Sequence, residues 1–187
     1  MKILLVIAHG RLSSLTRQAA EAFATSAKEN GHILEFADLV AEKFDPVLLE
    51  RDEPDWDNEN KIYSDEVLRE MERIERNDAT VVFFPVWWWS MPAILKGWID
   101  RVWNYGWAYG SKNYPHDRVL MVGIGGGTQN AYRKRDYDKA MQITIKTGIL
   151  EFCGVPNGDL KILYGATEGG TLPAEIIASA KVLGKEF

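Results

Sequence analysis

The chain has 187 residues, of which 46% are hydrophobic and 26% charged, and its formal net charge is −5 at pH 7. This length and composition suit one globular domain, so residues 1–187 are expected to fold as a unit. The acidic balance disfavours a duplex-binding surface, and no nucleic-acid partner is expected.

The single cysteine, Cys153, excludes an internal disulfide and lacks the companions that a zinc site needs, so no metal is expected. The apolar run Ile3–Ala8 is too short for a signal peptide, and no small-residue cleavage site follows it. Pro85 and Pro92 interrupt the most apolar later stretch, Val81–Leu95, which falls short of a membrane span. These features predict a cytoplasmic protein without a membrane span.

The first part of the chain alternates strand and helix patterns. Ile3–Ala8 is a continuous apolar run, typical of a strand buried on both faces. Ser13 or Ser14 can cap the next helix, whose apolar stripe ends before Asn30–Gly31. His32–Ala37 predicts a second strand.

A polar, acidic segment, Glu42–Asn60, follows and predicts a loop. We expect its carboxylates Asp52 and Glu53 to face solvent and not to form an acid–base pair. A helix should then begin near Ser64.

The rest of the chain continues the alternation. Ser90 is expected to cap a helix with Pro92 in its first turn, and Gly154 and Pro156 to stop a later one. The expected elements are strand Thr80–Pro85, helix Pro92–Val102, strand Arg118–Ile124, helix Tyr137–Phe152, strand Leu160–Tyr164 and helix Pro173–Leu183.

Five strands alternating with helices predict an α/β fold, a doubly wound five-stranded parallel sheet with helices on both faces. With a strand order of 2-1-3-4-5, the loops after strands one, three and four become neighbours at the carboxyl edge, where such sheets bind ligands. These loops are His9–Arg17, Val86–Ser90 and Gly125–Tyr132.

Each loop has two readings. Hydroxyls and basic residues at a helix start suit phosphate, although a plain serine cap explains them equally well. Three consecutive tryptophans, Trp87–Trp89, cannot all enter one core; they could flank a planar heteroaromatic ring, or combine core packing with an oligomer contact. The glycine-rich turn alone is weak evidence. His32 and His116 are assigned surface or structural roles.

At these residues the sequence resembles the NAD(P)H:quinone oxidoreductase (DT-diaphorase) family and its bacterial relatives. The matching stretches run in family order over most of the chain: Ala8–His9, Ser14–Thr16, Phe44–Pro46, Phe84–Val102, Trp107–Tyr109, Gly126–Gly127, Tyr132 and Gly148–Gly154.

The resemblance implies a flavodoxin-like, dimeric flavoprotein that relays a hydride from NADPH or NADH to a quinone-like acceptor. It implies flavin contacts on the phosphate side at His9, Ser14, Leu15 and Thr16, along the ring at Val86, Trp87, Trp88 and Trp89, and at the pyrimidine end at Gly125, Gly126, Gly127 and Tyr132. Tyr132 and Tyr109 are the candidate catalytic residues, with Tyr109 reaching toward the partner subunit's site.

Two departures from the family pattern matter. Asp138 stands where the animal enzymes have a histidine thought to stabilise the reduced flavin; Arg133, Lys134, Arg135 or backbone N–H groups are the candidate substitutes. The segment before the helix near Ser64 is shorter than in the animal enzymes, where it helps to hold the adenine of FAD. FAD remains the expected cofactor, with FMN as the alternative.

The main hypothesis is therefore a two-electron NAD(P)H dehydrogenase (quinone). The alternatives are a flavodoxin-type electron carrier and a regulatory subunit of a potassium efflux system. A homodimer is expected because Pro92–Trp103 and Tyr105–Tyr114 hold more aromatic surface than one core of this size buries comfortably.

Overall fold

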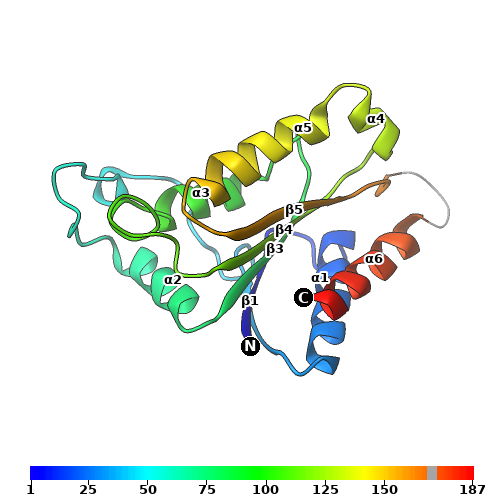
Figure 1. The fold of residues 1–187 in the computed structure, drawn as a ribbon, viewed down its shortest axis with the longest axis horizontal. Coiled ribbons are helices and arrows are strands. Elements are labelled where there is room, and N and C mark those ends of the chain that lie inside the picture. Colours follow the sequence, from blue (N-terminus) through cyan, green and yellow to red (C-terminus); the bar gives the residue numbers. More distant parts are fainter. Residues whose placement is uncertain (168–171) are drawn as a thin grey trace.

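The computed structural model describes residues 1–167 and 172–187, which form a five-stranded parallel sheet in the order β2-β1-β3-β4-β5 (Figure 1). This confirms the predicted sheet and its strand order. The strands are β1 (Lys2–Ile7), β2 (Ile33–Asp38), β3 (Ala79–Pro85), β4 (Arg118–Ile124) and β5 (Asn157–Leu163).

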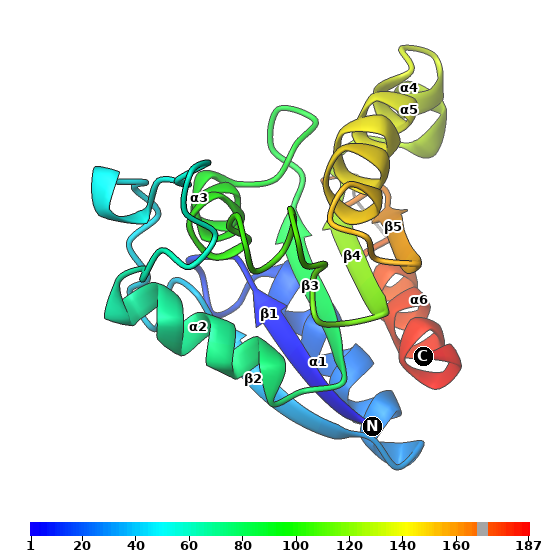
Figure 2. The same ribbon diagram turned by 60° about the vertical axis from the view of Figure 1, so that its left-hand side comes forward.

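Helices cover both faces of the sheet (Figures 1 and 2). Helices α1 and α6 pack together on one face, and α2, α3 and the α5–η2 segment lie on the other. The helical elements are α1 (Leu15–Glu29), η1 (Glu50–Asp52), α2 (Asp65–Glu75), α3 (Ala93–Val102), α4 (Gln129–Arg133), α5 (Tyr137–Met141), η2 (Gln142–Glu151) and α6 (Leu172–Glu186).

The buried strands explain the continuous apolar runs. In β1, Leu4 and Val6 pack on the α2–α3 side, whereas Leu5 and Ile7 pack on the α1–α6 side. Successive side chains of a strand point to opposite faces, so a strand covered on both faces needs an apolar residue at every position. All seven residues of β3 are buried accordingly.

One local prediction fails where the backbone has another task. Helix α3 begins at Ala93 with Pro92 as its N-cap, so the prediction that Ser90 caps it is wrong. Ser90 instead pairs with Trp87 through both its N–H and its C=O, each bond 3.1 Å long. The helix predicted over Tyr137–Phe152 is present, but its winding changes: α5 covers Tyr137–Met141, and η2 continues to Glu151 as a π-helix. Apolar periodicity does not resolve this wider winding.

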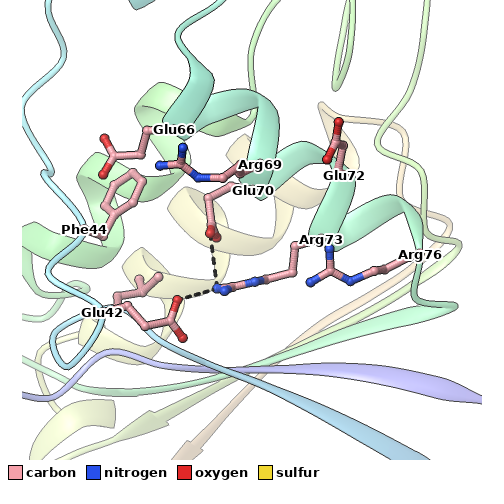
Figure 3. A pocket seen from close by; sticks show the side chains of 9 residues that line it. Glu42, Phe44, Glu66, Arg69, Glu70, Glu72, Arg73 and Arg76 are labelled. Atoms are coloured by element: carbon pink, nitrogen blue, oxygen red, sulfur yellow. Dashed lines mark hydrogen bonds and ion pairs between the residues drawn. The ribbon is translucent and has the colours of Figure 1, made fainter.

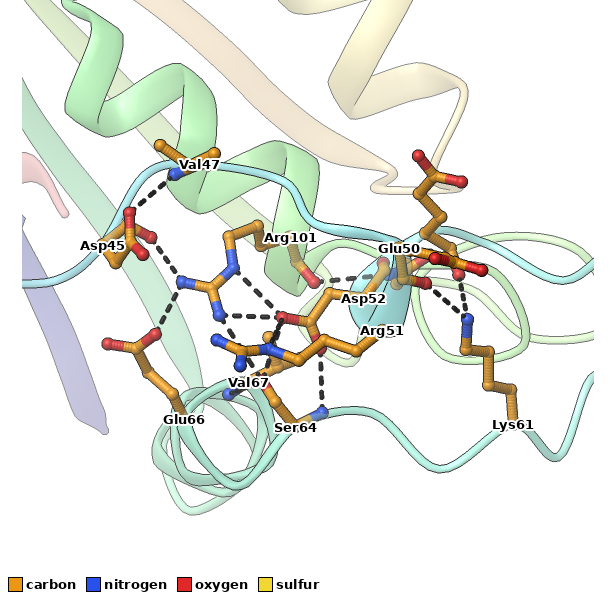
Figure 4. A network of polar contacts seen from close by, with 12 residues as sticks. Asp45, Val47, Glu50, Arg51, Asp52, Lys61, Ser64, Glu66, Val67 and Arg101 are labelled. Atoms are coloured by element: carbon orange, nitrogen blue, oxygen red, sulfur yellow. Dashed lines mark hydrogen bonds and ion pairs between the residues drawn. The ribbon is translucent and has the colours of Figure 1, made fainter.

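The carboxylate of Asp52 is fully buried, so its predicted exposure is wrong, whereas Glu53 is exposed (Figure 4). Arg101, also fully buried, reaches its Oδ2 through Nη2 at 2.8 Å. The N–H of Ser64 donates to Oδ1 at 2.8 Å. These contacts fasten η1 to the start of α2 and the end of α3, and they explain why a carboxylate in a charged segment leaves solvent.

Half of the aromatic residues between Pro92 and Tyr114 lie in the chain's own core. Trp98, Trp103 and Tyr114 are 0%, 4% and 4% exposed, respectively. The indole of Trp98 also donates to the Glu70 carboxylate at 2.9 Å. The core therefore buries three of these six rings, and Tyr105, Trp107 and Tyr109 remain half-buried. The homodimer stays a prediction.

Among the described residues, no helix combines the length and apolarity needed to cross a membrane. His116 is buried, with Nδ1 2.8 Å from the Thr80 hydroxyl and Nε2 2.9 Å from the Ile74 carbonyl oxygen. Burial lowers the pKa of its imidazole. These contacts fit the structural role predicted for it, and His32 is half-buried.

Candidate active site

Three loops meet at the carboxyl edge of the sheet, because the parallel strands β1, β3 and β4 are neighbours that end on the same side. They enclose two adjoining hollows. The first, here called the loop cavity, has a volume of about 220 Å³ and is lined by His9, Leu15, Thr16, Val86, Trp87 and Gly126. The second, here called the aromatic cavity, has about 470 Å³ and is lined by Val86, Trp88, Trp89, Gly126, Gly127 and Tyr132. Val86 and Gly126 line both.

The loop after β1 presents backbone donors to the loop cavity. Ser14 is fully buried and caps α1, its Oγ accepting the N–H of Arg17 at 3.2 Å. Within the described residues, the N–H groups of Leu15 and Thr16 have no acceptor, as expected in a first helical turn. Ser14 thus shapes the loop as a cap, while the next two residues line the cavity.

His9 is held in one orientation beside these donors. Its Nδ1 accepts the N–H of Arg11 at 3.0 Å, which leaves the proton of the neutral ring on Nε2. Partial burial, together with nearby Arg11, lowers the pKa of the imidazole. The ring meets that of Trp87 edge-on, with centroids 5.8 Å apart. His9 therefore offers a neutral Nε2–H donor.

The loop after β3 is a tight turn that presents tryptophans. Trp87 and Ser90 pair across it, and the central residues Trp88 and Trp89 both have positive φ, 51° and 53°. Positive φ costs a residue with a side chain roughly 1–2 kcal/mol. In Figure 2 the segment joining β3 to α3 rises clear of the sheet. Trp88 is 88% exposed. Such strain in an exposed turn is typical of a functional site.

The glycine loop after β4 forms the floor of the aromatic cavity. Its carbonyls accept hydrogen bonds from the segment that follows β5, including Ala166 to Gly125 at 2.9 Å and Thr167 to Gly126 at 3.2 Å. In the described part of the chain the N–H groups of Gly126 and Gly127 remain without an acceptor. Those two amides can donate to a ligand.

Tyr132 closes the cavity from α4. Its side chain is 5% exposed, and burial raises the pKa of its phenol, so the hydroxyl stays protonated at neutral pH. A Cβ at Gly125 would lie 3.0 Å from that hydroxyl. A side chain at position 125 would therefore force the Tyr132 ring to shift by a few tenths of an ångström.

Three further residues line the aromatic cavity that were not among the predicted site residues: Ala131, Arg135 and Tyr137. The ring of Tyr137 packs on Trp89 with centroids 4.0 Å apart. Of the three cations considered as substitutes for the family histidine, Arg135 reaches the lining, whereas Arg133 and Lys134 do not. Their position just after Tyr132 in the sequence indicated that one of the three could reach the site, but it did not indicate which one.

Tyr109 lies apart from both cavities. Its ring packs against Trp56, Tyr105 and Phe152, with centroids 6.1, 5.8 and 5.4 Å away, respectively. Within one chain it is therefore not brought together with the other candidate residues. Its role at a partner's site stays a prediction.

A separate charged hollow of about 400 Å³ lies along α2 (Figure 3). Arg73 points into it and pairs through Nη1 with Glu42 at 2.7 Å and Glu70 at 3.1 Å. Because these charges pair with one another, we interpret the side chains around the hollow as an ion-pair network that links α2 to the chain after β2. No group of three or more His, Cys, Asp or Glu residues within 1–167 and 172–187 could hold a metal ion.

The family model described as flavodoxin-like fold matches residues 1–184. The chain belongs to this flavodoxin-like family. An uncharacterized NAD(P)H oxidoreductase of Escherichia coli K12 is 38% identical over 163 residues, covering 87% of this chain and 83% of that protein. The NAD(P)H dehydrogenase [quinone] 1 of Cavia porcellus is 28% identical over 207 residues, covering 96% and 74%, respectively.

Among solved structures, this flavodoxin-like chain resembles an NAD(P)H:quinone oxidoreductase from Methanothermobacter marburgensis. The TM-score is 0.93 at 29% sequence identity, over 100% of this chain and 95% of that one. The predicted family resemblance is confirmed by these matches, which extend along nearly the whole chain.

Proposed function

We propose that this chain is a flavin-dependent NAD(P)H:quinone oxidoreductase that passes two electrons from NAD(P)H to a quinone-like acceptor, with residues 1–187 as one flavin-binding domain. The sequence relatives and the solved structure named above support the activity. The observation that carries the proposal is the pair of adjoining cavities, one with free backbone donors and one with aromatic walls.

The donor set of the loop cavity fits a flavin phosphate. The N–H groups of Leu15 and Thr16 lie at the positive end of α1, where phosphate is favoured, and the Thr16 hydroxyl and His9 Nε2–H add donors. Ser14 would act from behind this surface, since it is fully buried and bonded to its own helix.

The aromatic cavity fits a planar ring with polar edges. Val86, Trp87, Trp88 and Trp89 would lie along an isoalloxazine, and the free amides of Gly126 and Gly127 would donate to its pyrimidine oxygens. Gly125 supports this floor, with its own N–H bonded to the Leu163 carbonyl at 2.8 Å. The chemistry of the residues present thus suits the cofactor.

When bound, the flavin would supply the capacity to accept two electrons from a dihydronicotinamide and to release them to a quinone. The chain's own residues bind and orient. Tyr132 keeps its proton and offers a neutral hydroxyl at the cavity wall, while the tryptophan rings would pack along the flavin.

Purified protein tests the cofactor directly. We expect a yellow protein, or one that turns yellow on reconstitution, with FAD as the first candidate and FMN as the alternative. Chromatography of the released flavin distinguishes them. Failure to bind either flavin at micromolar concentration contradicts the proposal.

Stopped-flow mixing with NADH or NADPH separates a reductase from an electron carrier. A reductase is reduced directly by one of these donors, whereas a flavodoxin-type carrier is not. Parallel initial-rate lines are expected if donor and acceptor use the aromatic cavity in turn. Intersecting lines would indicate two separate sites.

We further propose a cytoplasmic homodimer in which Tyr109 reaches the partner's site. Its aromatic cluster with Trp56, Tyr105 and Phe152 supports this, because Trp56 and Phe152 are 65% and 66% exposed. A lone cysteine, whose burial raises the pKa of its thiol to about 11, suits a reducing compartment. Tyr109→Ala should lower turnover and leave flavin content intact. Light scattering that finds a fully active monomer of 21.2 kDa contradicts the shared site.

A further inference from the structure

The aromatic cavity has a buried floor and a charged rim. Tyr132 is 5% exposed, and Gly126 and Gly127 are half-buried. Arg135 also lines the cavity, yet it is exposed, as is Trp88 across from the floor. A ligand that stacks on a ring bound in this cavity and extends outward therefore passes Arg135.

Arg135 is left without a counter-charge. The acidic residues that follow it are engaged elsewhere: Asp136 pairs with Lys139 Nζ at 2.7 Å, and Asp138 accepts the N–H of Lys139 at 3.0 Å. Arg135 itself makes no ion pair with the described residues. In a chain of net charge −5, an unpaired guanidinium beside an aromatic cavity is a place for an anion.

We propose that Arg135 binds a phosphate group of the dinucleotide electron donor while its nicotinamide ring stacks on the flavin bound in the aromatic cavity. This inference rests on the function proposed above and adds a residue that recognises the donor. A dihydronicotinamide dinucleotide combines a planar ring with phosphates some distance away, which matches a cavity with aromatic walls and a cation at its rim.

The exposure of Arg135 favours this role over one in the ring chemistry. A charge in water is screened and has little influence on a ring some distance away. A guanidinium fork, by contrast, binds phosphate bidentately even at a wet surface. Arg135 is thus better suited to hold the trailing part of a substrate than to stabilise a reduced cofactor.

The test compares Arg135→Gln with Lys134→Gln in the flavin-loaded protein, using NADPH, NADH and the phosphate-free donor 1-benzyl-1,4-dihydronicotinamide. Lys134 is the matched control, because it is an exposed cation directly before Arg135 in the chain and does not line the cavity. We expect Arg135→Gln to raise KM for the phosphate-bearing donor about tenfold, the loss of one charge-assisted hydrogen bond, at nearly unchanged kcat. KM for the benzyl donor should not change, and Arg135→Lys should recover part of the loss.

A binding measurement accompanies the kinetics. Calorimetric titration with oxidised NADP⁺ and NAD⁺ should show the same weakening, and binding to the variant should depend less on salt. A loss confined to the NADP⁺ and NADPH arms assigns Arg135 to the 2′-phosphate, whereas a loss in all dinucleotide arms assigns it to the pyrophosphate.

Unchanged constants for every dinucleotide, or an equal loss with the benzyl donor, overturn the inference; the second result would place Arg135 in the flavin chemistry or in the fold. Either failure leaves the proposed function standing if the wild-type protein is reduced normally. If none of the three donors reduces the wild-type flavoprotein, the proposed function itself fails and the inference with it.

Discussion

The two ends of α3 differ in whether their polar and aromatic side chains are exposed or buried. Before the helix, the turn at Trp87–Ser90 leaves Trp88 88% exposed in a positive-φ conformation. At its last turn, Arg101 is fully buried and paired with Asp52 and Glu66, at 2.8 and 2.6 Å (Figure 4). The indole before the helix is open to solvent, whereas the guanidinium at the last turn is buried and hydrogen-bonded.

This difference separates the ligand-facing part of the molecule from its scaffold. A buried network is stable only when every member has a partner, so the Arg101 contacts fix the chain between β2 and α2 in one arrangement. An exposed strained turn contributes little to the stability of the fold, and such strain persists where the exposed aromatic rings bind a ligand. The predictions that follow test this contrast.

The largest effect is expected from Arg101→Met. The change leaves Asp52 buried without its counter-charge, which should lower the free energy of unfolding by about 3–5 kcal/mol. Urea unfolding should show a lower midpoint at unchanged slope. The double variant Arg101→Met/Asp52→Asn should lose less than the single variant. A loss below about 1 kcal/mol would mean that the network does not hold the scaffold.

Trp88→Ala should weaken flavin binding about three- to tenfold, because one aromatic wall of the cavity is removed. Ile62→Ala is the control, since Ile62 is 82% exposed in a loop away from the cavities. Trp56 is unsuitable because its ring packs on Tyr105 and Tyr109. Fluorescence titration with flavin measures the dissociation constants. Equal effects of the two changes on the dissociation constant would mean that Trp88 does not contact the flavin.

Trp88→Gly and Trp88→Ala should differ in stability without flavin. Glycine relieves a positive-φ strain of roughly 1–2 kcal/mol but carries about 0.5–1 kcal/mol of extra chain entropy, so the glycine variant should be the more stable by up to about 1.5 kcal/mol. Relative to wild type, Trp89→Gly should gain less stability than Trp88→Gly, because Trp89→Gly also removes the packing of the indole on Tyr137. Urea midpoints of the flavin-free variants decide this, and a less stable glycine variant speaks against strain in the turn.

The smallest effect concerns pH. Burial opposes ionisation of Asp52, but hydrogen bonds from Arg101 and Ser64 outweigh it and hold the pKa of the carboxyl below its usual value. A depressed pKa stabilises the folded state above the unfolded value of about 3.9, and that contribution is lost as the pH falls. The stability difference between wild type and Asp52→Asn should narrow between pH 6 and pH 3. A difference independent of pH would contradict the shifted pKa.

Much of the fold could be predicted because it depends on local patterns. Continuous apolar runs identified strands buried on both faces, and Ser14 and Ser64 do cap α1 and α2. Once the strand order was assumed, parallel strands brought the three candidate loops to one edge, and all but Ser14, Gly125 and Tyr109 of the candidate residues line the two cavities. Periodicity and capping act within a few residues, so a sequence displays them directly.

Only the tertiary structure decided which polar residues leave water and which line the site. Asp52 is buried because Arg101, 49 residues later in the chain, meets it across the packed α2 and α3. Ser90 is lost as a cap because the turn binds it to Trp87, and Arg135 lines the cavity while Lys134 does not. These outcomes depend on how elements distant in sequence pack together, and a local pattern carries no record of the partner that packing will supply.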